Sequence, residues 1–504
     1  MLSKIAVALA LTAVFFVVRS SRADVTPASL FSDHMVLQQG MSVPVWGRAE
    51  PGEQVTVTIG SQTQTANADV DSKWMVHLAE LKSSSDPVEM TITGKNTVII
   101  KDILIGEVWL GSGQSNMEFS VSKSVKRFAG VNDEAKEIVA ANYPRLRMFT
   151  VKMKMTDAPQ DDCEGDWEVC SPETVPAFSA VGYFFSRDLQ KAIDLPVGFI
   201  NSSYGASTAQ AWISKDNFSG DPQFNPLMDA FAKSVATWDA AHLKSPTTVP
   251  ATVPSTRPAR GAPKNPHQDQ HNPTLLWNAM VHPIQPYAIK GAIWYQGESI
   301  TGTTAQFIAL TETVITSWRK EWGEGDFPFY FVQLAALDNN SNKPEVREAQ
   351  AQVLKIPNTA MAVTIDIGDK SNVHPKDKQD LGDRLARIAR ANIYGEKIEF
   401  SGPMYESMAV DGDSVRVKFS HVGGGLVAKN GDLKTFEIAG KDGHFVSALA
   451  KIDGDEVVVS ASDVPEPMAV RYAWNRWPQG CNLYNADGLP AAPFRSDGPA
   501  TEHN

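Results

Sequence analysis

The sequence predicts an α/β fold with a parallel-sheet core between an N-terminal and a C-terminal antiparallel β domain. Between residues 103 and 394, short apolar runs alternate with amphipathic stretches, which is typical of a parallel sheet with helices on both faces. Residues 24–101 and the chain after residue 399 instead alternate apolar and polar residues between turn signals, as antiparallel strands do. We therefore expect three domains, at 24–101, 102–398 and 399–504.

Composition narrows the function. The chain has 504 residues, 42% of them hydrophobic and 21% charged, an ordinary balance for a multidomain globular protein. Its net charge of −12 argues against nucleic acid or an anionic membrane as a partner.

The first 23 residues have the pattern of a secretory signal peptide. Lys4 precedes an apolar run over residues 5–18, and Ser21-Arg-Ala23 is a small-x-small cleavage site. The apolar run is short for a membrane span. We expect cleavage near Ala23 and a secreted or periplasmic protein without a membrane span, with a retained N-terminal anchor as the alternative.

The core elements follow one another in regular order. Predicted strands cover residues 195–200, 290–295, 328–337 and 360–367, and predicted helices cover residues 178–192, 303–321 and 376–393. Residues 245–273 are rich in Pro, Thr and Ala without an apolar period. They predict a flexible surface insert.

The flanking domains contain no obvious catalytic motif. In the first, Val55, Val57 and Ile59 alternate with polar residues. The second has an aromatic group that either packs or lines a sugar site, formed by Tyr472, Trp474, Trp477 and Tyr484.

The chain contains Cys163, Cys170 and Cys481. An oxidising compartment permits a Cys163–Cys170 bridge, which leaves Cys481 unpaired. We interpret the three as structural thiols, unpaired or locally paired, rather than as groups with a role in thiol chemistry. None of the three has metal-ligand spacing, so no metal site is expected.

The main chemical signal is the stretch Leu110-Gly-Ser-Gly-Gln-Ser-Asn-Met-Glu118, which follows an apolar run. Two glycines allow a tight turn, and the polar residues after them can begin a helix with Ser115 or Asn116 as its N-cap. This places the Ser115 hydroxyl at the carboxyl end of a strand, where α/β sheets keep their sites. We interpret Ser115 as a nucleophile; the alternative is an ordinary glycine-rich turn.

A serine nucleophile needs a base to take its proton. His374 follows a predicted strand and precedes a predicted helix, so it falls on the same edge of the sheet as Ser115. His282 lies in an apolar context and is the second candidate.

An oxyanion hole needs hydrogen-bond donors aimed at the developing charge. The Ser115 amide, the Gly205 amide and the Gln296 side chain follow strands on the same edge. The alternative for Gly205 and Gln296 is a turn glycine and a polar strand cap.

Taken together, the motifs resemble a known family. Gly113-Gln-Ser-Asn-Met117, Trp294-Tyr-Gln-Gly-Glu-Ser299 and Val373-His-Pro375 are similar to motifs of the sialate O-acetylesterases, within the SGNH/GDSL hydrolase superfamily. The resemblance covers nearly the whole chain after residue 23.

The resemblance implies an SGNH-type α/β/α hydrolase that removes O-acetyl groups from sugars through a serine acyl-enzyme, with Ser115 as nucleophile and His374 as base. Gly205 and Gln296 match oxyanion positions, and no metal or organic cofactor is implied. The same motifs supply Gln114, Asn116 and Trp294 as candidates for the substrate pocket.

One departure concerns the acid that orients the histidine. The superfamily usually has an Asp two or three residues before its histidine, where this chain has Ser371 and Asn372. Another carboxylate could serve instead, or a backbone carbonyl could hold the ring. The carboxylate candidates are Glu298, Asp366 and Asp369. Without such a partner, the pKa of His374 is expected near its ordinary value of about 6.5.

The resulting expectation is a sialate O-acetylesterase whose partner is an O-acetylated sugar or glycan. The alternatives are an acetyl esterase acting on xylan or another polysaccharide and, in a different class, a non-catalytic carbohydrate-binding protein with the same fold. A binding protein has no use for a nucleophile beside a base.

Overall fold

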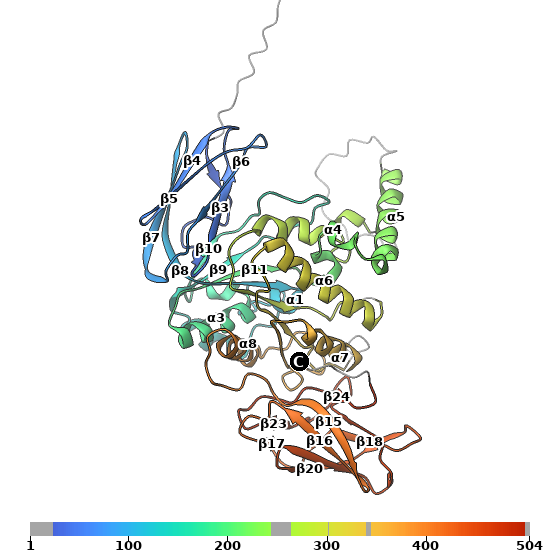
Figure 1. Ribbon diagram of the computed structural model, residues 1–504. Coiled ribbons are helices and arrows are strands. Elements are labelled where there is room, and N and C mark those ends of the chain that lie inside the picture. Colours follow the sequence, from blue (N-terminus) through green and yellow to red (C-terminus); the bar gives the residue numbers. More distant parts are fainter. Residues whose placement is uncertain (1–23, 243–263, 301, 339–343, 499–504) are drawn as a thin grey trace, which may run out of the picture.

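The structure is a computed structural model that describes residues 24–242, 264–300, 302–338 and 344–498. The predicted signal peptide and residues 245–263 of the predicted insert lie outside these ranges. Figure 1 shows the N-terminal β domain in blue, the mixed α/β core from cyan through green and yellow to brown, and the C-terminal β domain in orange and red. The predicted fold class is confirmed.

The core is a twisted sheet whose central strands run parallel. Its order is β10-β9-β11-β8-β12-β13-β14, and β10 at the edge pairs antiparallel with β9. The strands are β8 (Thr97–Gly113), β9 (Tyr143–Thr150), β10 (Trp167–Cys170), β11 (Val197–Ser203), β12 (Gly291–Tyr295), β13 (Phe329–Val332) and β14 (Thr359–Ala362). The loops after β8, β11, β12 and β14 therefore all leave the sheet at the carboxyl end of its parallel strands, which we call the site edge.

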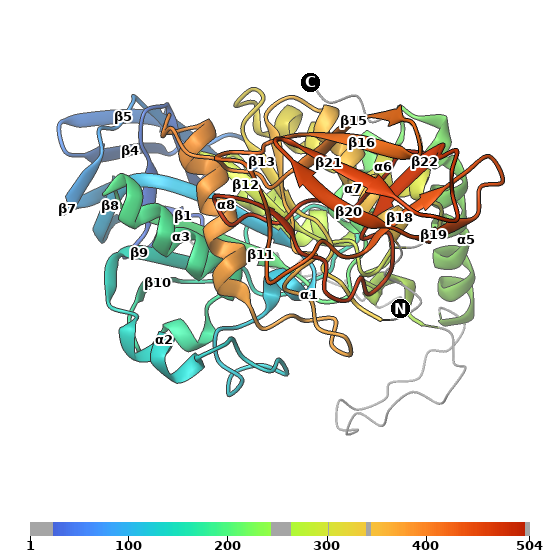
Figure 2. The same cartoon turned by 90° about the horizontal axis from the view of Figure 1, so that it is seen from below.

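Helices cover both faces of this sheet (Figure 2). Successive strand residues point to opposite faces of a sheet, so side chains of the core strands reach the helices on both sides. On one face, Trp109 of β8 packs against Phe185 of α3 with ring centroids 5.0 Å apart. On the other face, Trp294 packs against Trp318 of α6 at 5.9 Å. The helices are α2 (Glu134–Ala140), α3 (Ala180–Ile193), α4 (Lys215–Phe218), α5 (Asn225–His242), α6 (Thr304–Trp322), α7 (Pro344–Gln352) and α8 (Lys378–Asn392).

The N-terminal domain is continuous with the core through β8. The first part of this strand pairs antiparallel with β7, and its last part pairs parallel with β11 and β12. The predicted domain boundary at residue 101 thus falls inside one strand. The other strands are β1 (Thr26–Pro27), β2 (Val36–Gln38), β3 (Val43–Arg48), β4 (Gln54–Ile59), β5 (Gln62–Asn67), β6 (Lys73–Leu78) and β7 (Ser84–Thr93).

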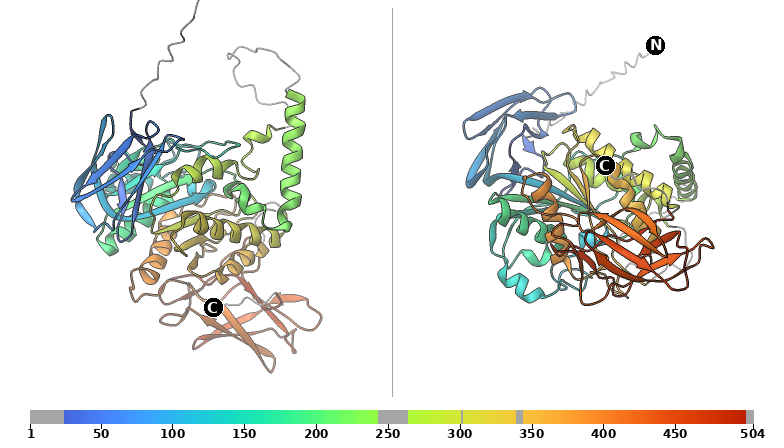
Figure 3. Two further views of the ribbon diagram at one scale, coloured as in Figure 1. Left: turned by 45° about the horizontal axis from the view of Figure 1, so that its top comes forward. Right: turned by 60° about the horizontal axis from the view of Figure 1, so that its bottom comes forward.

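The C-terminal domain packs beneath the core on the side of α7 and α8 (Figures 1 and 3). Its strands are β15 (Met404–Asp411), β16 (Ser414–Ser420), β17 (Leu426–Ala428), β18 (Phe436–Ala439), β19 (Phe445–Ser447), β20 (Leu449–Asp453), β21 (Glu456–Ser460), β22 (Ala469–Tyr472), β23 (Leu483–Asn485) and β24 (Phe494–Arg495). Tyr472 is buried against Phe436 and Phe494, so this member of the aromatic group packs in the domain core.

Two strands end earlier than the sequence predicts. Residues 333–337 stay apolar after β13, but side chains take the place of strand partners there. Gln350 Oε1 accepts a hydrogen bond from the Leu334 amide at 2.8 Å, and Arg347 Nε donates to the Leu334 carbonyl at 3.0 Å. After β14, residues 363–367 likewise leave the sheet. Hydrophobicity alone does not distinguish such a side-chain-held loop from a strand.

The cysteines are free thiols in this structure. Cys163 and Cys170 are buried, and burial raises the pKa of each thiol to about 12. The bridge that the sequence permitted is absent, and the structure favours its alternative of unpaired structural thiols. Among the described residues, no helix is long and apolar enough to cross a membrane.

Candidate active site

A glycine turn brings Ser115 out of the central strand. Gly113 has φ +127°, and a β-carbon there would lie 2.2 Å from the carbonyl oxygen of Tyr295 on β12. Only glycine fits this close approach. The chain then enters the short helix α1 (Ser115–Glu118), with Gln114 rather than Ser115 or Asn116 as its N-cap.

Ser115 and His374 meet at the edge of the sheet. His374 Nε2 lies 2.8 Å from Ser115 Oγ, although the two residues are far apart in the chain. The His374 ring packs edge-on against Phe128 with centroids 5.1 Å apart, and Phe119 lies at 6.3 Å. The histidine therefore holds a fixed position from which Nε2 can accept the serine proton.

Burial and nearby cations lower the pKa of His374 to about 4. Burial contributes most, followed by the positive charges of Lys378 and Arg127. This differs from the expected value of about 6.5, because removing the ring from water disfavours its charged form. The imidazole is consequently neutral at pH 7 and able to accept a proton.

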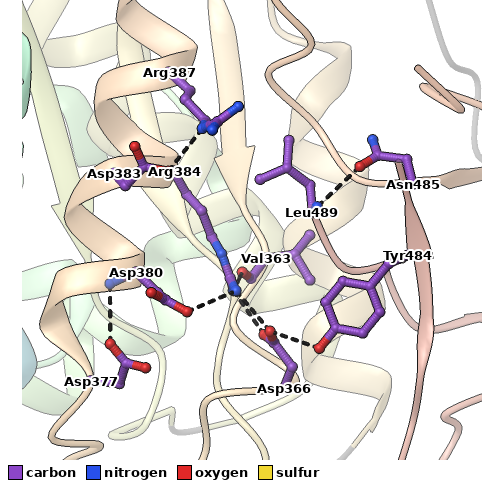
Figure 4. Close-up of polar contacts among 10 residues, drawn as sticks. All are labelled: Val363, Asp366, Asp377, Asp380, Asp383, Arg384, Arg387, Tyr484, Asn485 and Leu489. Atoms are coloured by element: carbon purple, nitrogen blue, oxygen red, sulfur yellow. Dashed lines mark hydrogen bonds and ion pairs between the residues drawn. The ribbon is translucent and has the colours of Figure 1, made fainter. Parts of the chain in front are cut away.

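No candidate carboxylate reaches the His374 ring. Asp366 pairs with Arg384 at 2.7 Å and accepts from Tyr484 Oη at 3.0 Å (Figure 4). Asp369 accepts from the amides of Ser371 and Asn372.

Glu298 is the third candidate, and its Oε1 accepts from the Asn116 side chain. Asn372 Oδ1 accepts from the His374 backbone amide at 3.0 Å. Each of these side chains thus has another partner among the described residues, although Glu298 Oε2 itself has none.

Asn116 joins the loops that carry the site. Its amide donates to Glu298 and, at 2.9 Å, to the Val373 carbonyl next to His374. Its oxygen accepts from Lys378 Nζ at 2.7 Å. We call Asn116, Glu298 and Lys378 the Asn116 network. It connects the loop after β12, the His374 loop and the start of α8 to the residue beside Ser115.

The Asn116 network contains ionisable groups with shifted pKa values. Burial lowers the pKa of Lys378 to about 7, against an opposing contribution from Glu298. Burial also raises the pKa of Glu298. Shifted pKa values of this kind cluster at functional sites.

The expected oxyanion donors surround Ser115 in different ways. A β-carbon on Gly205 would lie 3.7 Å from Ser115 Cβ, which brings the Gly205 backbone beside the nucleophile. Among the described residues, the amides of Ser115 and Gly205 form no backbone hydrogen bond. Gln296 Nε2 instead donates to Gln114 Oε1 and to the Ser207 carbonyl, both at 3.3 Å, so its two hydrogens already have acceptors.

The expected pocket residues are buried. Gln114, Asn116 and Trp294 are at most 2% exposed. Gln114 Oε1 also accepts from the Ser299 amide at 3.2 Å, and Trp294 packs in the core. Their side chains hold loops and core together rather than line an open surface. His282 contacts the Gln160 carbonyl and Trp277, and forms no contact with Ser115.

Two cations near the site were not anticipated from the sequence. Lys378 is 1% exposed, although a lysine in the first turn of a helix gives no signal of burial. Arg127 is exposed, and its Nη2 lies 2.8 Å from the position of a Gly205 β-carbon. Its loop has no strong secondary-structure pattern. Within the described ranges, no group of three or more His, Cys, Asp or Glu side chains is arranged to hold a metal ion.

Comparison with known proteins also indicates an esterase that acts on acetylated sugars. Residues 262–391 match the family model of carbohydrate esterases described as sialic acid-specific acetylesterases. The sialate O-acetylesterase of Mus musculus is 30% identical, over 93% of this chain and 93% of its own length. The human sialate O-acetylesterase is 29% identical over 95% of this chain and 94% of its own length.

A solved structure agrees with these relatives. A carbohydrate acetylesterase from Xanthomonas citri has a TM-score of 0.80 and 32% identity, covering 94% of this chain and 100% of its own. The predicted resemblance and enzyme class are confirmed. The chain is a carboxylic ester hydrolase and belongs to the sialate O-acetylesterase family.

Proposed function

We propose that the protein is an exported serine esterase that removes O-acetyl groups from sialic acids. The 2.8 Å contact between Ser115 Oγ and His374 Nε2 carries this proposal. A non-catalytic binding protein would not need a hydroxyl held against a neutral imidazole. Export rests on the signal-peptide pattern of residues 1–23, with cleavage near Ala23.

The reaction begins with proton transfer from Ser115 to His374. Ser115 Oγ attacks the acetyl carbonyl carbon, and the amides of Ser115 and Gly205 stabilise the oxyanion that forms. His374 then returns the proton to the sugar oxygen as the C–O bond breaks. Water, deprotonated by His374, attacks the acetyl-serine, and acetate leaves as Ser115 regains its proton.

Arg127 supports an acidic sugar over a neutral one. Its Nη2 and Glu118 Oε2 each lie 2.8 Å from the position of a Gly205 β-carbon, and among the described residues Glu118 forms its ion pair with Lys126 rather than with Arg127. Guanidinium matches the geometry of a carboxylate, the group that distinguishes sialic acids from neutral sugars. The alternative substrate is a neutral acetylated polysaccharide. The similar structure from Xanthomonas citri is described only as a carbohydrate acetylesterase, which fits either substrate.

The first test replaces Ser115 by Ala. We expect acetate release from a chromogenic acetyl ester to be lost while the melting temperature stays near wild type. In the wild-type protein, rapid-quench mass spectrometry should detect one acetyl group on the peptide that contains Ser115. Near wild-type turnover in a folded Ser115→Ala variant would remove Ser115 from the mechanism.

The second test addresses the sugar and replaces Arg127 by Gln. A charge-assisted hydrogen bond contributes about 1.5–3 kcal/mol, and solvent screens an exposed one. We therefore expect KM for O-acetyl sialic acid to rise about tenfold. KM for its carboxyl methyl ester and for the neutral chromogenic ester should stay unchanged.

Lys123→Gln is the matched control for Arg127→Gln, since Lys123 is an exposed cation of the same loop whose backbone amide contacts Glu134. Equal loss on the acidic and neutral esters would contradict recognition of the carboxylate. Faster hydrolysis of acetyl-xylan than of O-acetyl sialic acid by the wild type would favour the polysaccharide alternative.

A further inference from the structure

Asn116 presents a buried amide that uses both of its hydrogens and its oxygen. Its nitrogen donates to Glu298 Oε1 and to the Val373 carbonyl, and its oxygen accepts from Lys378 Nζ at 2.7 Å. An amide turned end over end would set its oxygen against two acceptors and its nitrogen against a donor. The partners therefore fix which end of the amide faces Val373.

The bond to Val373 matters because the next residue is His374. Residues 369–377 contain no helix or strand, so no regular backbone hydrogen bonding fixes this loop. Among the described residues, the only hydrogen-bond partner of the His374 side chain is Ser115 itself. The bond from Asn116 to the Val373 carbonyl ties the loop to α1, the helix that carries Ser115.

Glu298 is the partner whose position stability explains least. Its Oε2 is buried and has no hydrogen-bond partner among the described residues, and burial raises its pKa. A carboxyl group kept from water without full hydrogen bonding destabilises a fold. Only the contact of Oε1 with Asn116 offsets this cost. A group retained in this way indicates a role beyond stability.

We propose that Glu298 is a positioning residue that acts through Asn116. Its Oε1 holds one hydrogen of the amide, so the other hydrogen points at the Val373 carbonyl. His374 is thereby kept against Ser115.

This inference rests on the proposed function, in which Ser115 gives its proton to His374. Glu298 acts on the backbone of the His374 loop, where a triad aspartate would act on the ring. The role needs an acceptor and no charge, since a neutral carboxyl group also accepts through its carbonyl oxygen.

The test compares Glu298→Leu with Glu298→Gln in the full-length protein. Leucine removes the acceptor for Asn116, whereas glutamine keeps one in its side-chain carbonyl. We expect kcat for the neutral chromogenic ester to fall about 100-fold in Glu298→Leu, because a shift of about 1 Å in a reacting group has an effect of this size. KM should change little, since Glu298 acts through Asn116 and not on the ester. Glu298→Gln should keep kcat within about threefold of wild type.

Glu321→Leu is the matched control. Glu321 is also a half-buried carboxyl group that accepts side-chain hydrogen bonds, and its donors Ser214, Asn217 and Trp277 lie outside the Ser115 site. This change should lower the melting temperature but leave kcat unchanged where the variant is folded. The comparison separates positioning from a loss of stability alone.

Two outcomes would overturn the proposal. One is a kcat close to wild type in folded Glu298→Leu, and the other is a fall in Glu298→Gln as large as in Glu298→Leu. If Glu298→Leu does not fold, Asn116→Asp decides, because it replaces the donor to Val373 by an oxygen at almost constant volume. A kcat close to wild type in that variant would contradict the proposal.

Ser115→Ala distinguishes this inference from the proposed function on which it rests. An inactive Ser115→Ala variant beside a fully active Glu298→Leu variant would reject the role of Glu298 alone. An active, folded Ser115→Ala variant would reject the esterase mechanism itself.

Discussion

The residues around His374 determine how strong a base it is. Phe119 and Phe128 pack against the ring, which is partly buried, while Lys378 and Arg127 add positive charge. A pKa of about 4 keeps His374 neutral at pH 7. It also makes the ring a weak base, because forming the charged imidazolium during the reaction costs free energy. The usual triad aspartate lowers that cost. Here the Asn116 network takes the place of an aspartate only in position: it holds the His374 loop through Val373, and its Lys378 adds a positive charge near the ring.

The pKa values predict a pH–rate profile with an acid limb near pH 4. Activity should rise as pH increases through that value, because His374 must lose its proton to act as base. Lys378→Met removes one of the cations that lower the pKa of His374, so this pKa should increase and the acid limb should move to higher pH. The measurement is kcat/KM for a neutral chromogenic ester between pH 3.5 and pH 9, a range chosen to bracket the pKa values of about 4 and about 7.

Lys376→Met provides the control, since Lys376 is an exposed cation two residues closer to His374 in the same loop. It should leave the acid limb in place. An unmoved limb in Lys378→Met would show that the charge of Lys378 does not reach the ring.

At the scale of elements, the turn between β8 and α1 decides where the nucleophile lies. Gly113→Ala would place a β-carbon 2.2 Å from the Tyr295 carbonyl oxygen, at a backbone φ of +127°. Either the turn or β12 must then move. We expect a loss of stability of more than about 1 kcal/mol and a fall in kcat, because Ser115 shifts relative to His374.

Gly395→Ala separates the effect of the positive φ from the effect of the close approach to Tyr295. Gly395 also has a positive φ, of +69°, but a β-carbon there would meet nothing within 4 Å. Thermal melting and kcat for both variants decide the matter. A similar stability loss in both, with normal kcat in Gly113→Ala, would show that close packing against Tyr295 does not position the serine.

The sequence predicted the elements that end at the site better than the others. Ser115 and His374 each follow an apolar run with turn residues behind it, so their position on one edge followed from parallel topology. The helices at 303–321 and 376–393 agree with α6 (Thr304–Trp322) and α8 (Lys378–Asn392) within two residues. Strands β9 and β10 and helix α5 were missed. Helix α5 buries no side chain, so its sequence has no strong apolar face to detect.

Side-chain partners in the site could not be predicted in the same way. Three carboxylates were equal candidates for holding His374, because spacing does not show which side chain another loop will claim. Arg384 and Tyr484 claim Asp366, and backbone amides claim Asp369. The burial of Lys378 could not be predicted from the sequence, because it depends on contacts with Asn116 and with Glu298 in the loop after β12.

At the scale of the whole molecule, buried polar contacts fix the C-terminal domain to the core. Arg347 donates to the carbonyls of Asn475 and Arg476 at 2.9 Å, and Arg495 pairs with Glu348 at 2.8 and 2.9 Å. The Asp366–Arg384 pair joins the segment after β14, which leads to the His374 loop, to α8, and Tyr484 donates to Asp366 from β23 (Figure 4). Domain attachment and the position of the His374 loop therefore share the same residues.

This arrangement predicts that Asp366 acts in stability rather than as the acid of a triad. Asp366→Asn leaves the buried Arg384 charge without its main partner, a change that typically costs about 3–5 kcal/mol. We expect a lower melting temperature, while the acid limb of the pH–rate profile stays near pH 4. Asp369→Asn, a half-buried position in the same loop whose carboxylate has no cationic partner among the described residues, should change stability little. The double variant Asp366→Asn with Arg384→Met removes the unpaired charge and should recover part of the lost stability. A large fall in kcat together with a shifted acid limb in Asp366→Asn, at a temperature where the protein is folded, would instead make Asp366 the group that orients His374.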